Sequence, residues 1–284
     1  MKTIIKDFPE IGQIEYKMVA NREELEKSAA LLYREYQLRG WVQRRYNKSG
    51  LRLTLYNALP ETRIFIALKG KEAIGTITVI PDSPMGLPMD KAYKDIIDPL
   101  RRQKRRICEV GQLATRNDLF GKGLFSMFNF KKLNFIFTLF NCVFQYTCRK
   151  IHMDNLCIVV NPKAMLFKFL PFETMGIARY YGMDRRSVNR KPLAAKQLDL
   201  RTTEERVKHR QGLHKIFYGE KFSLEFFDHP HRMTPEDLRY FFTEKSDAFQ
   251  EAEPQELDYI LSCYSLSEDD RQEILIEAEK VKAA

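Results

Sequence analysis

Hydrophobic positions in the first third of the chain recur at spacings that predict a helix followed by a hairpin. Residues 22–38 follow Asn21, which starts a capping-box-like Asn-Arg-Glu-Glu segment, and their apolar side chains fall on one helical face (Leu25, Ala29, Leu32 and Tyr36). Residues 62–69 and 73–80 are apolar runs joined by a Gly-Lys-Glu turn, which predicts two paired strands.

The stretch from Leu87 to Thr115 combines a predicted helix, a cationic block and a predicted strand. Asp90 is placed to cap a helix whose apolar positions are Tyr93, Ile96, Ile97 and Leu100. Ile107, Val110 and Leu113 then predict a buried strand, and Glu109 lies inside it. A carboxylate in an apolar strand costs several kcal/mol unless it is paired or used, so Glu109 is the first candidate functional residue.

Residues 124–146 are apolar on nearly every side, which leaves three interpretations open. The uncharged part, Leu133 to Tyr146, is too short to span a bilayer, so a buried helix is the default. The same helix could wall an apolar tunnel with its Phe side chains, or lie in a membrane interface with its lysines near headgroups.

The remaining pattern predicts a mixed sheet followed by helices. Residues 156–160 are an apolar strand, Pro162 suits the first position of a helix, and residues 176–200 have the pattern of paired strands. From about residue 201 the pattern changes to helices, including a strong start at Thr234-Pro235. We therefore predict an α/β (α+β) fold, with a mixed central sheet in residues 1–200 and a helical extension in residues 201–284.

Charge is distributed unevenly along the 284 residues, whose formal net charge is +9. Residues 1–233 hold 42 Lys and Arg against 24 Asp and Glu, whereas residues 234–284 hold 5 against 14. A basic body favours an acidic partner, and a solvated basic surface without a partner is an equal alternative. No nucleic-acid-binding module is recognisable, so nucleic acid is not expected as a partner.

The cysteines and the N-terminus bear on the compartment. Five scattered cysteines without a CxxC motif suit reduced thiols, and the first residues are too few and too polar for a signal peptide. These features predict a cytoplasmic protein, with peripheral contact at the inner face of the membrane as an alternative.

Several short segments resemble one enzyme family in the same order. They are Gly-Leu-Pro-Met-Asp at 86–90, Ile97-Asp98, Cys108-Glu109-Val110, the segment 161–173 and the segment 190–200. Together these segments resemble the bacterial long-chain N-acyl amino acid synthases, which belong to the GNAT-like acyltransferase clan and are related to the acyl-homoserine lactone synthases. The resemblance covers roughly residues 15–200 and implies a GNAT-like sheet and transfer of an acyl group from a thioester to an amine.

Within this resemblance Glu109 corresponds to a general base or a substrate-orienting group, and burial would raise its pKa toward neutrality. A purely structural Glu109, paired with an arginine, is the alternative. The family has Glu-x-Ser-Arg at this point, whereas this chain has Gly111 and Gln112, so any role of the family's arginine is in doubt. Gln112 can supply hydrogen bonds but no charge.

The resemblance also implies a donor and an acceptor. Relatives that use coenzyme A carry a glycine loop for pyrophosphate, and here Asp118 stands at its leading position, which disfavours coenzyme A. We expect no tightly bound cofactor, an acyl-phosphopantetheine arm on acyl carrier protein as donor, and an amino acid as acceptor. The expected carrier-protein surface is Arg101, Arg102, Lys104, Arg105, Arg106, Lys122, Lys131 and Lys132.

Aromatic side chains are the candidates for the substrate pocket. Trp41, the only tryptophan, follows Gly40 as in the lactone synthases and could line the pocket or simply pack against the helix. The expected acyl channel is bordered by Phe125, Phe128, Phe135 and Phe140.

Other chemistries have little support, because the histidines show no metal-ligand spacing and there is no nucleophile elbow or Walker loop. The leading hypothesis is an N-acyltransferase that moves a long acyl chain from acyl carrier protein to an amino acid. Two alternatives stay open: a lactone-forming or other small-amine acyltransferase, and a non-catalytic module that binds lipid or carrier protein.

Overall fold

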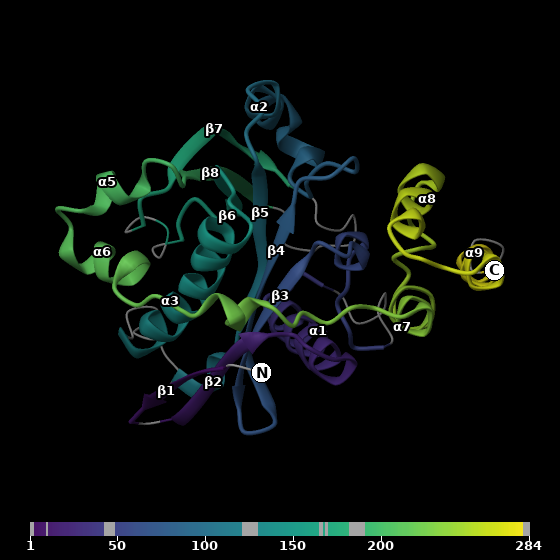
Figure 1. The fold of residues 1–284 in the computed structure, drawn as a ribbon, viewed down its shortest axis with the longest axis horizontal. Helices are drawn as coiled ribbons and strands as arrows, with labels where there is room; N and C mark the ends of the chain where they lie inside the picture. Colours follow the sequence, from purple (N-terminus) through teal and green to yellow (C-terminus); the bar gives the residue numbers. More distant parts are fainter. Residues whose placement is uncertain are drawn as a thin grey trace.

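A single mixed sheet of eight strands organises the computed structural model, which describes residues 3–9, 11–42, 49–120, 130–164, 167, 170–181 and 191–280. The strand order is β1-β2-β3-β4-β5-β6-β8-β7 (Figure 1). All neighbours are antiparallel except β5 and β6, which are parallel. The strands are β1 (Ile4–Phe8), β2 (Gly12–Met18), β3 (Arg63–Lys69), β4 (Glu72–Pro81), β5 (Ile107–Thr115), β6 (Asn155–Val160), β7 (Glu173–Tyr180) and β8 (Pro192–Asp199).

Helices cover both faces of the sheet. Helix α1 (Arg22–Leu38) lies on one face and α3 (Phe130–Gln145) on the other, and α2 (Asp90–Arg102) lies at the end of the sheet (Figure 1). The predicted cap of α1 is confirmed, because the Asn21 side chain accepts a hydrogen bond from the Glu24 N–H at 2.9 Å. The hairpin predicted at residues 62–80 is confirmed as β3 and β4.

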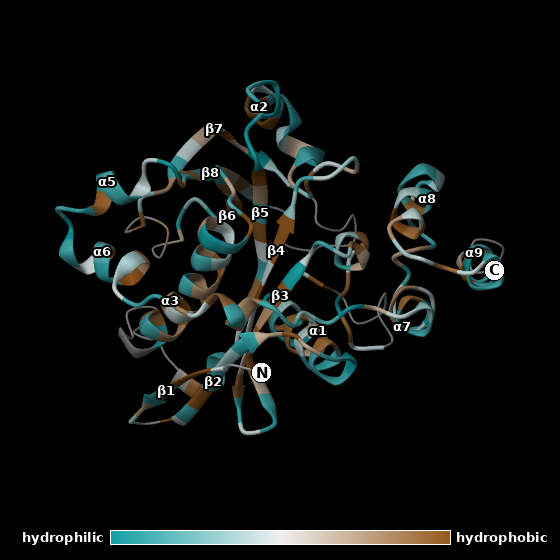
Figure 2. Ribbon diagram, viewed as in Figure 1, coloured by the Kyte–Doolittle hydropathy of each residue, from teal (hydrophilic) through white to brown (hydrophobic). Residues whose placement is uncertain are grey.

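Each face of the sheet has its own apolar core, as the alternation of side chains along a strand requires. Cys108 and Val110 of β5 join the cluster under α3, whereas Ile66 and Leu68 of β3 join the cluster under α1. Figure 2 shows this as a hydrophobic band along the central strands, with more hydrophilic residues on the outer helices. The mixed sheet flanked by helices is the fold class that the sequence predicts.

The C-terminal helices belong to both cores. Helices α5 (Thr203–Val207) and α6 (Gln211–Tyr218) add Val207 and Phe217 to the cluster under α3. Helices α7 (Pro235–Arg239), α8 (Pro254–Ser262) and α9 (Glu268–Lys280) contribute to the cluster that contains α1. A domain boundary at residue 200 stays a prediction.

Helix α2 is held against the end of the sheet by polar contacts. The Tyr93 hydroxyl accepts a hydrogen bond from the Arg179 N–H at 2.8 Å and donates to the Leu193 carbonyl. The predicted capping role of Asp90 is wrong: Asp90 is the first residue of α2, and its carboxylate instead accepts from the Leu87 N–H at 3.1 Å and from Arg101 at 2.6 Å. None of the described helices is long and apolar enough to cross a membrane.

Candidate active site

The two parallel strands at the centre of the sheet pair over only three residues. Ile107, Cys108 and Glu109 of β5 lie opposite Asn155, Leu156 and Cys157 of β6. Strand β5 continues to Thr115 and β6 to Val160 without further pairing between them. Among the described residues, the β6 side of β5 therefore has no strand partner beyond Glu109.

Glu109 lies at the last paired position of this short ladder, and its side chain is buried. Its carboxylate accepts a hydrogen bond from the Met89 N–H at 2.7 Å, just before α2 begins. Among the described residues no cation forms an ion pair with Glu109, so the structural alternative of an arginine partner finds no support there. Burial raises the pKa of Glu109 to about 8; the Met89 N–H opposes this and the Asp90 carboxylate adds to it.

Two tyrosines lie within the electrostatic reach of Glu109. Burial raises the pKa of Tyr56 and Tyr181, and the Glu109 carboxylate raises both further. Tyr56 comes from the short helix η2 (Leu55–Ala58), and Tyr181 follows the end of β7. The residues around Glu109 therefore come from three separate parts of the chain, which only the fold brings together.

Gln112 forms a β-bulge three residues beyond Glu109. Gln112 and Leu113 stand opposite the single residue Ile77 of β4, and Gln112 adopts a left-handed backbone with φ of 51°. The extra residue reverses the alternation, so that Val110 faces the α3 core and Ala114 faces the α1 core. A bulge increases the local twist of a strand. This is consistent with pairing between β5 and β6 that stops after three residues.

The Gln112 amide is fully engaged by neighbouring side chains. Its oxygen accepts from Asn57 at 3.0 Å and from Thr78 at 2.9 Å, and its nitrogen donates to Asn57 at 2.9 Å and to Thr54 at 3.2 Å. These four bonds use two donors and two acceptor positions of the amide. Gln112 thus fixes the bulge to Thr54 and Asn57, at the start of η2 and within it.

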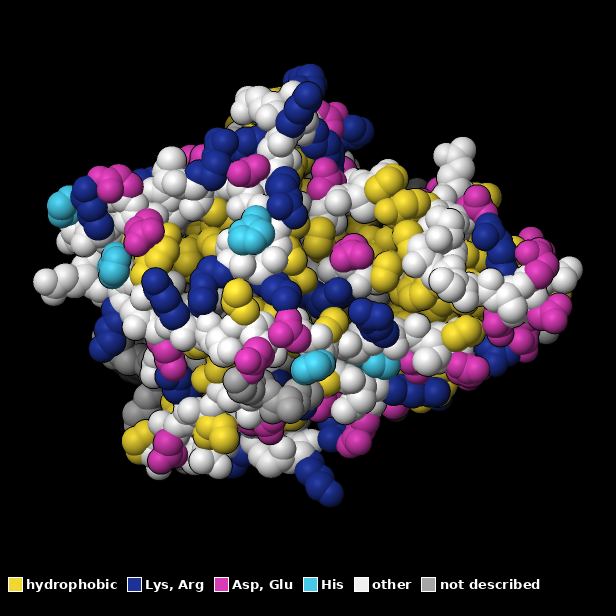
Figure 3. All heavy atoms as spheres, in the orientation of Figure 1, with side chains coloured by type: hydrophobic (Ala, Val, Ile, Leu, Met, Phe, Trp, Pro, Cys, Tyr) yellow, Lys and Arg dark blue, Asp and Glu magenta, His cyan; other side chains and the backbone are white. Residues whose placement is uncertain are grey.

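The cations of the predicted carrier-protein surface have different surroundings. Arg101 donates to Asp82, Asp90 and Asp98 at 2.6 to 2.8 Å and ties α2 to the loop after β4. Arg105 is paired with Asp199 at 2.7 Å. Arg102, Lys104 and Arg106 are exposed. Figure 3 shows Lys and Arg side chains at the end of the molecule where Figure 1 places α2, and acidic side chains around α9.

Lys132 also has a protein partner, since it donates to Asn117 at 2.6 Å, and Asn117 in turn donates to the buried Glu35 at 2.8 Å. Lys122, Phe125 and Phe128 lie outside the described residues, as does the side chain of Lys131. The structure therefore leaves Arg102, Lys104 and Arg106 as the exposed described members of the set.

The predicted pocket aromatics fall in two places. Phe135 and Phe140 of α3 are buried in the core, where Phe135 contacts Tyr16 with ring centroids 5.6 Å apart and Phe140 contacts Phe172 at 5.8 Å. Trp41 is 38% exposed and meets the ring of Tyr36 edge-on at 4.9 Å. Trp41 and the two phenylalanines therefore do not line the same side of a pocket.

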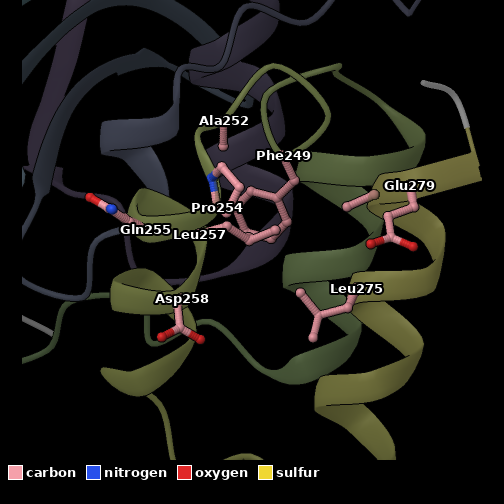
Figure 4. A pocket seen from close by; sticks show the side chains of 9 residues that line it. Phe249, Ala252, Pro254, Gln255, Leu257, Asp258, Leu275 and Glu279 are labelled. Carbon is pink, nitrogen blue, oxygen red and sulfur yellow. The ribbon is translucent and has the colours of Figure 1, made fainter.

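Two cavities lie near the C-terminal helices. One of about 370 Å³ is bordered by Phe249, Leu257 and Leu275, with Asp258 and Glu279 among its polar lining residues (Figure 4). A second of about 420 Å³ is lined by Asn57, Arg63 and His231, among others. Neither lining includes Glu109. No group of three or more His, Cys, Asp and Glu side chains in the described part of the chain could hold a metal ion.

A buried carboxylate with a pKa near 8 can accept a proton from an amine, which is a step that N-acyl transfer requires. Fold and site together define a GNAT-like acyltransferase.

Comparison with known families identifies the particular family. The model of the family described as "N-acyl amino acid synthase FeeM" matches residues 27–183, more than half of the chain. The chain belongs to the FeeM N-acyl amino acid synthase family, which confirms the resemblance seen in the sequence.

The solved structure of FeeM agrees with this assignment at the level of the fold. FeeM, an N-acyl amino acid synthase from uncultured soil microbes, has a TM-score of 0.55 and 24% identity, over 70% of this chain and 97% of that chain. The acyl-homoserine lactone synthase LasI has a TM-score of 0.45 and 15% identity, over 74% of this chain and 97% of that one. No curated protein matches the chain.

Proposed function

We propose that this acyltransferase moves a long-chain acyl group from acyl carrier protein to the amino group of an amino acid. The observation that carries the proposal is the buried Glu109, which forms no ion pair within the described part of the chain and lies where β5 and β6 stop pairing. Membership of the FeeM family supports the acceptor class, and the exposed cations beside α2 support an acidic donor.

In the proposed reaction the amine nitrogen attacks the thioester carbonyl while Glu109 removes a proton from the nitrogen. The carbon–nitrogen bond forms, the carbon–sulfur bond breaks, and the proton held by Glu109 passes to the departing thiolate. Main-chain N–H groups on the free edge of β5 are the proposed donors to the oxyanion. The amides of the phosphopantetheine arm can add to the same edge as an extra strand would.

The donor arm is common to acyl carrier protein and coenzyme A, so the proposed preference rests on surface charge. Arg102, Lys104 and Arg106 form the exposed cationic group nearest to the end of α2. A carrier protein with an acidic surface would be attracted to this group over about 10 Å at 0.1 M salt.

The acyl chain requires a dry channel, and we propose that α3 borders it. Phe135 and Phe140 are the described residues of the proposed wall, and both are buried and packed against other rings. Phe140→Trp should shorten the preferred acyl chain if the channel opens there, whereas unchanged chain preference together with lower stability would make Phe140 a core residue only.

Lipid extracts from a bacterial host that expresses the protein test the function directly, with Glu109→Gln as the matched control. New N-acyl amino acids in the wild-type extract, absent from the control, are the expected result. Acyl lactones would identify a signal-synthase activity instead, and extracts identical to those of the empty host would contradict catalysis and favour a binding module.

A further inference from the structure

Tyr93 is a completely buried tyrosine of α2 whose hydroxyl is anchored in the sheet. The hydroxyl accepts a hydrogen bond from the Arg179 N–H of β7 at 2.8 Å and donates to the Leu193 carbonyl of β8. Arg179 and Leu193 lie opposite each other where the two strands resume their pairing after the register shift in β7. The hydroxyl therefore ties α2 to two strands at one point (Figure 1).

Further contacts hold α2 against β7. The Arg179 guanidinium donates to the Ala92 carbonyl at 2.8 Å and to the Asp95 carboxylate at 2.6 Å. A Cβ atom at Gly176 of β7 would lie 2.5 Å from the Ile96 side chain, so the helix approaches the strand closely. The first turns of α2 thus have a fixed place relative to the sheet.

The first turn of α2 connects Tyr93 to Glu109 through Met89. The Tyr93 N–H donates to the Met89 carbonyl at 2.8 Å, and the Met89 N–H donates to the Glu109 carboxylate at 2.7 Å. Tyr93 departs from helical geometry, with φ of −131° and ψ of 18°, so α2 is kinked at the residue whose side chain is anchored. Hydrogen bonds in series therefore join β8 to the proposed base.

The charge on Glu109 depends on this connection. The Met89 N–H lowers the pKa of Glu109, against burial and the Asp90 carboxylate, which raise it. Asp90 is itself bound by Arg101 at 2.6 Å. Four further neighbours have raised pKa values of their own and stay uncharged while Glu109 titrates: Tyr56 of η2, Cys108 of β5, Cys157 of β6 and Tyr181 after β7.

We infer that Tyr93 is a positioning residue for acyl transfer, because its hydroxyl fixes the first turn of α2 and so holds the Met89 N–H against the Glu109 carboxylate. This inference rests on the proposed function, in which Glu109 is the base. Tyr93→Phe keeps the buried ring and removes only the hydroxyl, so it releases the anchor without opening a large cavity. The Met89 N–H should then stabilise the charged carboxylate less, and ionisation of Glu109 should require a higher pH.

Two readouts test this role. Protein labelled with carbon-13 at the glutamate carboxyl carbon is titrated by NMR, and Glu109→Gln identifies the signal of Glu109. The value of kcat/KM is measured over the same pH range with palmitoyl-acyl carrier protein and the amino acid accepted best of the twenty. For Tyr93→Phe we expect the midpoint of the Glu109 titration to rise by about 0.5–1 pH unit. The value of kcat/KM should then fall about 3- to 10-fold at pH 7 and less than about twofold at pH 9.

Tyr240→Phe is the matched control, because the Tyr240 hydroxyl donates to Glu26 at 3.2 Å and joins η7 (Tyr240–Glu244) to α1. This control should leave the titration and the rate unchanged. Arg179→Gln removes the guanidinium contacts with α2 but keeps the main-chain N–H, so it should shift the midpoint less in the same direction. Arg179→Gln carries the test if Tyr93→Phe folds poorly.

An unchanged or lower Glu109 midpoint in folded Tyr93→Phe, or in Arg179→Gln in its place, would overturn the positioning role while leaving Glu109 as the base. A wild-type protein that transfers no acyl group at any pH would instead overturn the proposed function. The titration alone would then decide whether Tyr93 holds Met89 against Glu109.

Discussion

At the scale of single residues, the site depends on a carboxylate that burial holds mostly neutral at pH 7. The hydrogen bond that Glu109 accepts from the Met89 N–H favours the charged form but does not offset the loss of hydration. With a pKa of about 8, only about one Glu109 in ten is ionised at pH 7. The neutral form of Glu109 favours the folded protein, whereas the proposed base is the charged form. The two roles can therefore be measured separately.

The folding role predicts a specific dependence of stability on pH. Glu109 has a higher pKa in the folded protein than its ordinary value of 4.5, so between pH 4.5 and 8 the folded state binds more protons than the unfolded state. Its contribution to the free energy of unfolding therefore falls by roughly 1.4 kcal/mol per pH unit in that window and is constant above it. Glu109→Gln lacks this titration and keeps an acceptor for Met89.

Urea unfolding of the wild type and Glu109→Gln at pH 5 and pH 8.5 measures this difference. We expect the variant to gain a few kcal/mol relative to the wild type on going to the higher pH. A variant that is instead less stable by about 3–5 kcal/mol at both pH values would show that Glu109 has a charged partner after all.

The sequence predicts Glu109 because a carboxylate in an apolar strand conflicts with the local pattern. It could not predict Tyr56 or Tyr181, since their proximity to Glu109 depends on how η2 and the end of β7 meet β5. The saturation of Gln112 likewise depends on Asn57, which is 55 residues away in the chain.

At the scale of elements, the apolar pattern of the sequence predicts only part of the sheet. The helices at 22–38 and 90–102 and strands β3 to β6 follow apolar periodicity and were predicted. The N-terminal hairpin of β1 and β2 was missed, because β1 is an edge strand with several partly exposed or exposed positions and no continuous apolar run. The bulge at Gln112 was also missed, since a bulge arises from the pairing of two strands and not from one strand's sequence.

The packing of α3 on β4 depends on a glycine. A Cβ atom at Gly75 would lie 2.6 Å from the Phe135 ring and 2.9 Å from Leu139, so the helix approaches the strand too closely for any side chain. We expect Gly75→Ala to lower the free energy of unfolding by about 1–3 kcal/mol, because a fully buried ring must move. Gly111→Ala is the matched control, since a Cβ there meets nothing within 4 Å. Similar urea midpoints for both variants would show that α3 adjusts freely.

At the scale of the whole molecule, the separation of charge is the feature that most affects partners. Exposed cations lie beside α2, whereas the acidic residues concentrate in α7 to α9, whose apolar faces share a core with α1. The acidic helices are therefore packed on the body through apolar contacts. We propose that the exposed cations near α2 bind an acidic partner.

Reversing two of these charges tests the carrier-protein surface. Arg102→Glu with Arg106→Glu should raise the KM for palmitoyl-acyl carrier protein about tenfold at low salt, with a smaller effect at 0.5 M salt, because the attraction is screened. The control is Lys69→Glu with Lys71→Glu, an equal change of charge at the exposed turn between β3 and β4, at the other end of the molecule (Figure 1). Equal effects of the two pairs would make the interaction a general consequence of net charge.

The pH dependence of acyl transfer by the wild type and Glu109→Gln tests the central claim most directly. With Glu109 as the base, wild-type kcat/KM should rise with pH, with a midpoint near 8, and then level off. Glu109→Gln should be folded, should lose on the order of 10²–10⁴ in rate, and should lack that rise. A folded Glu109→Gln protein with wild-type rate and the same pH profile would contradict the account, because proton removal would then require another group.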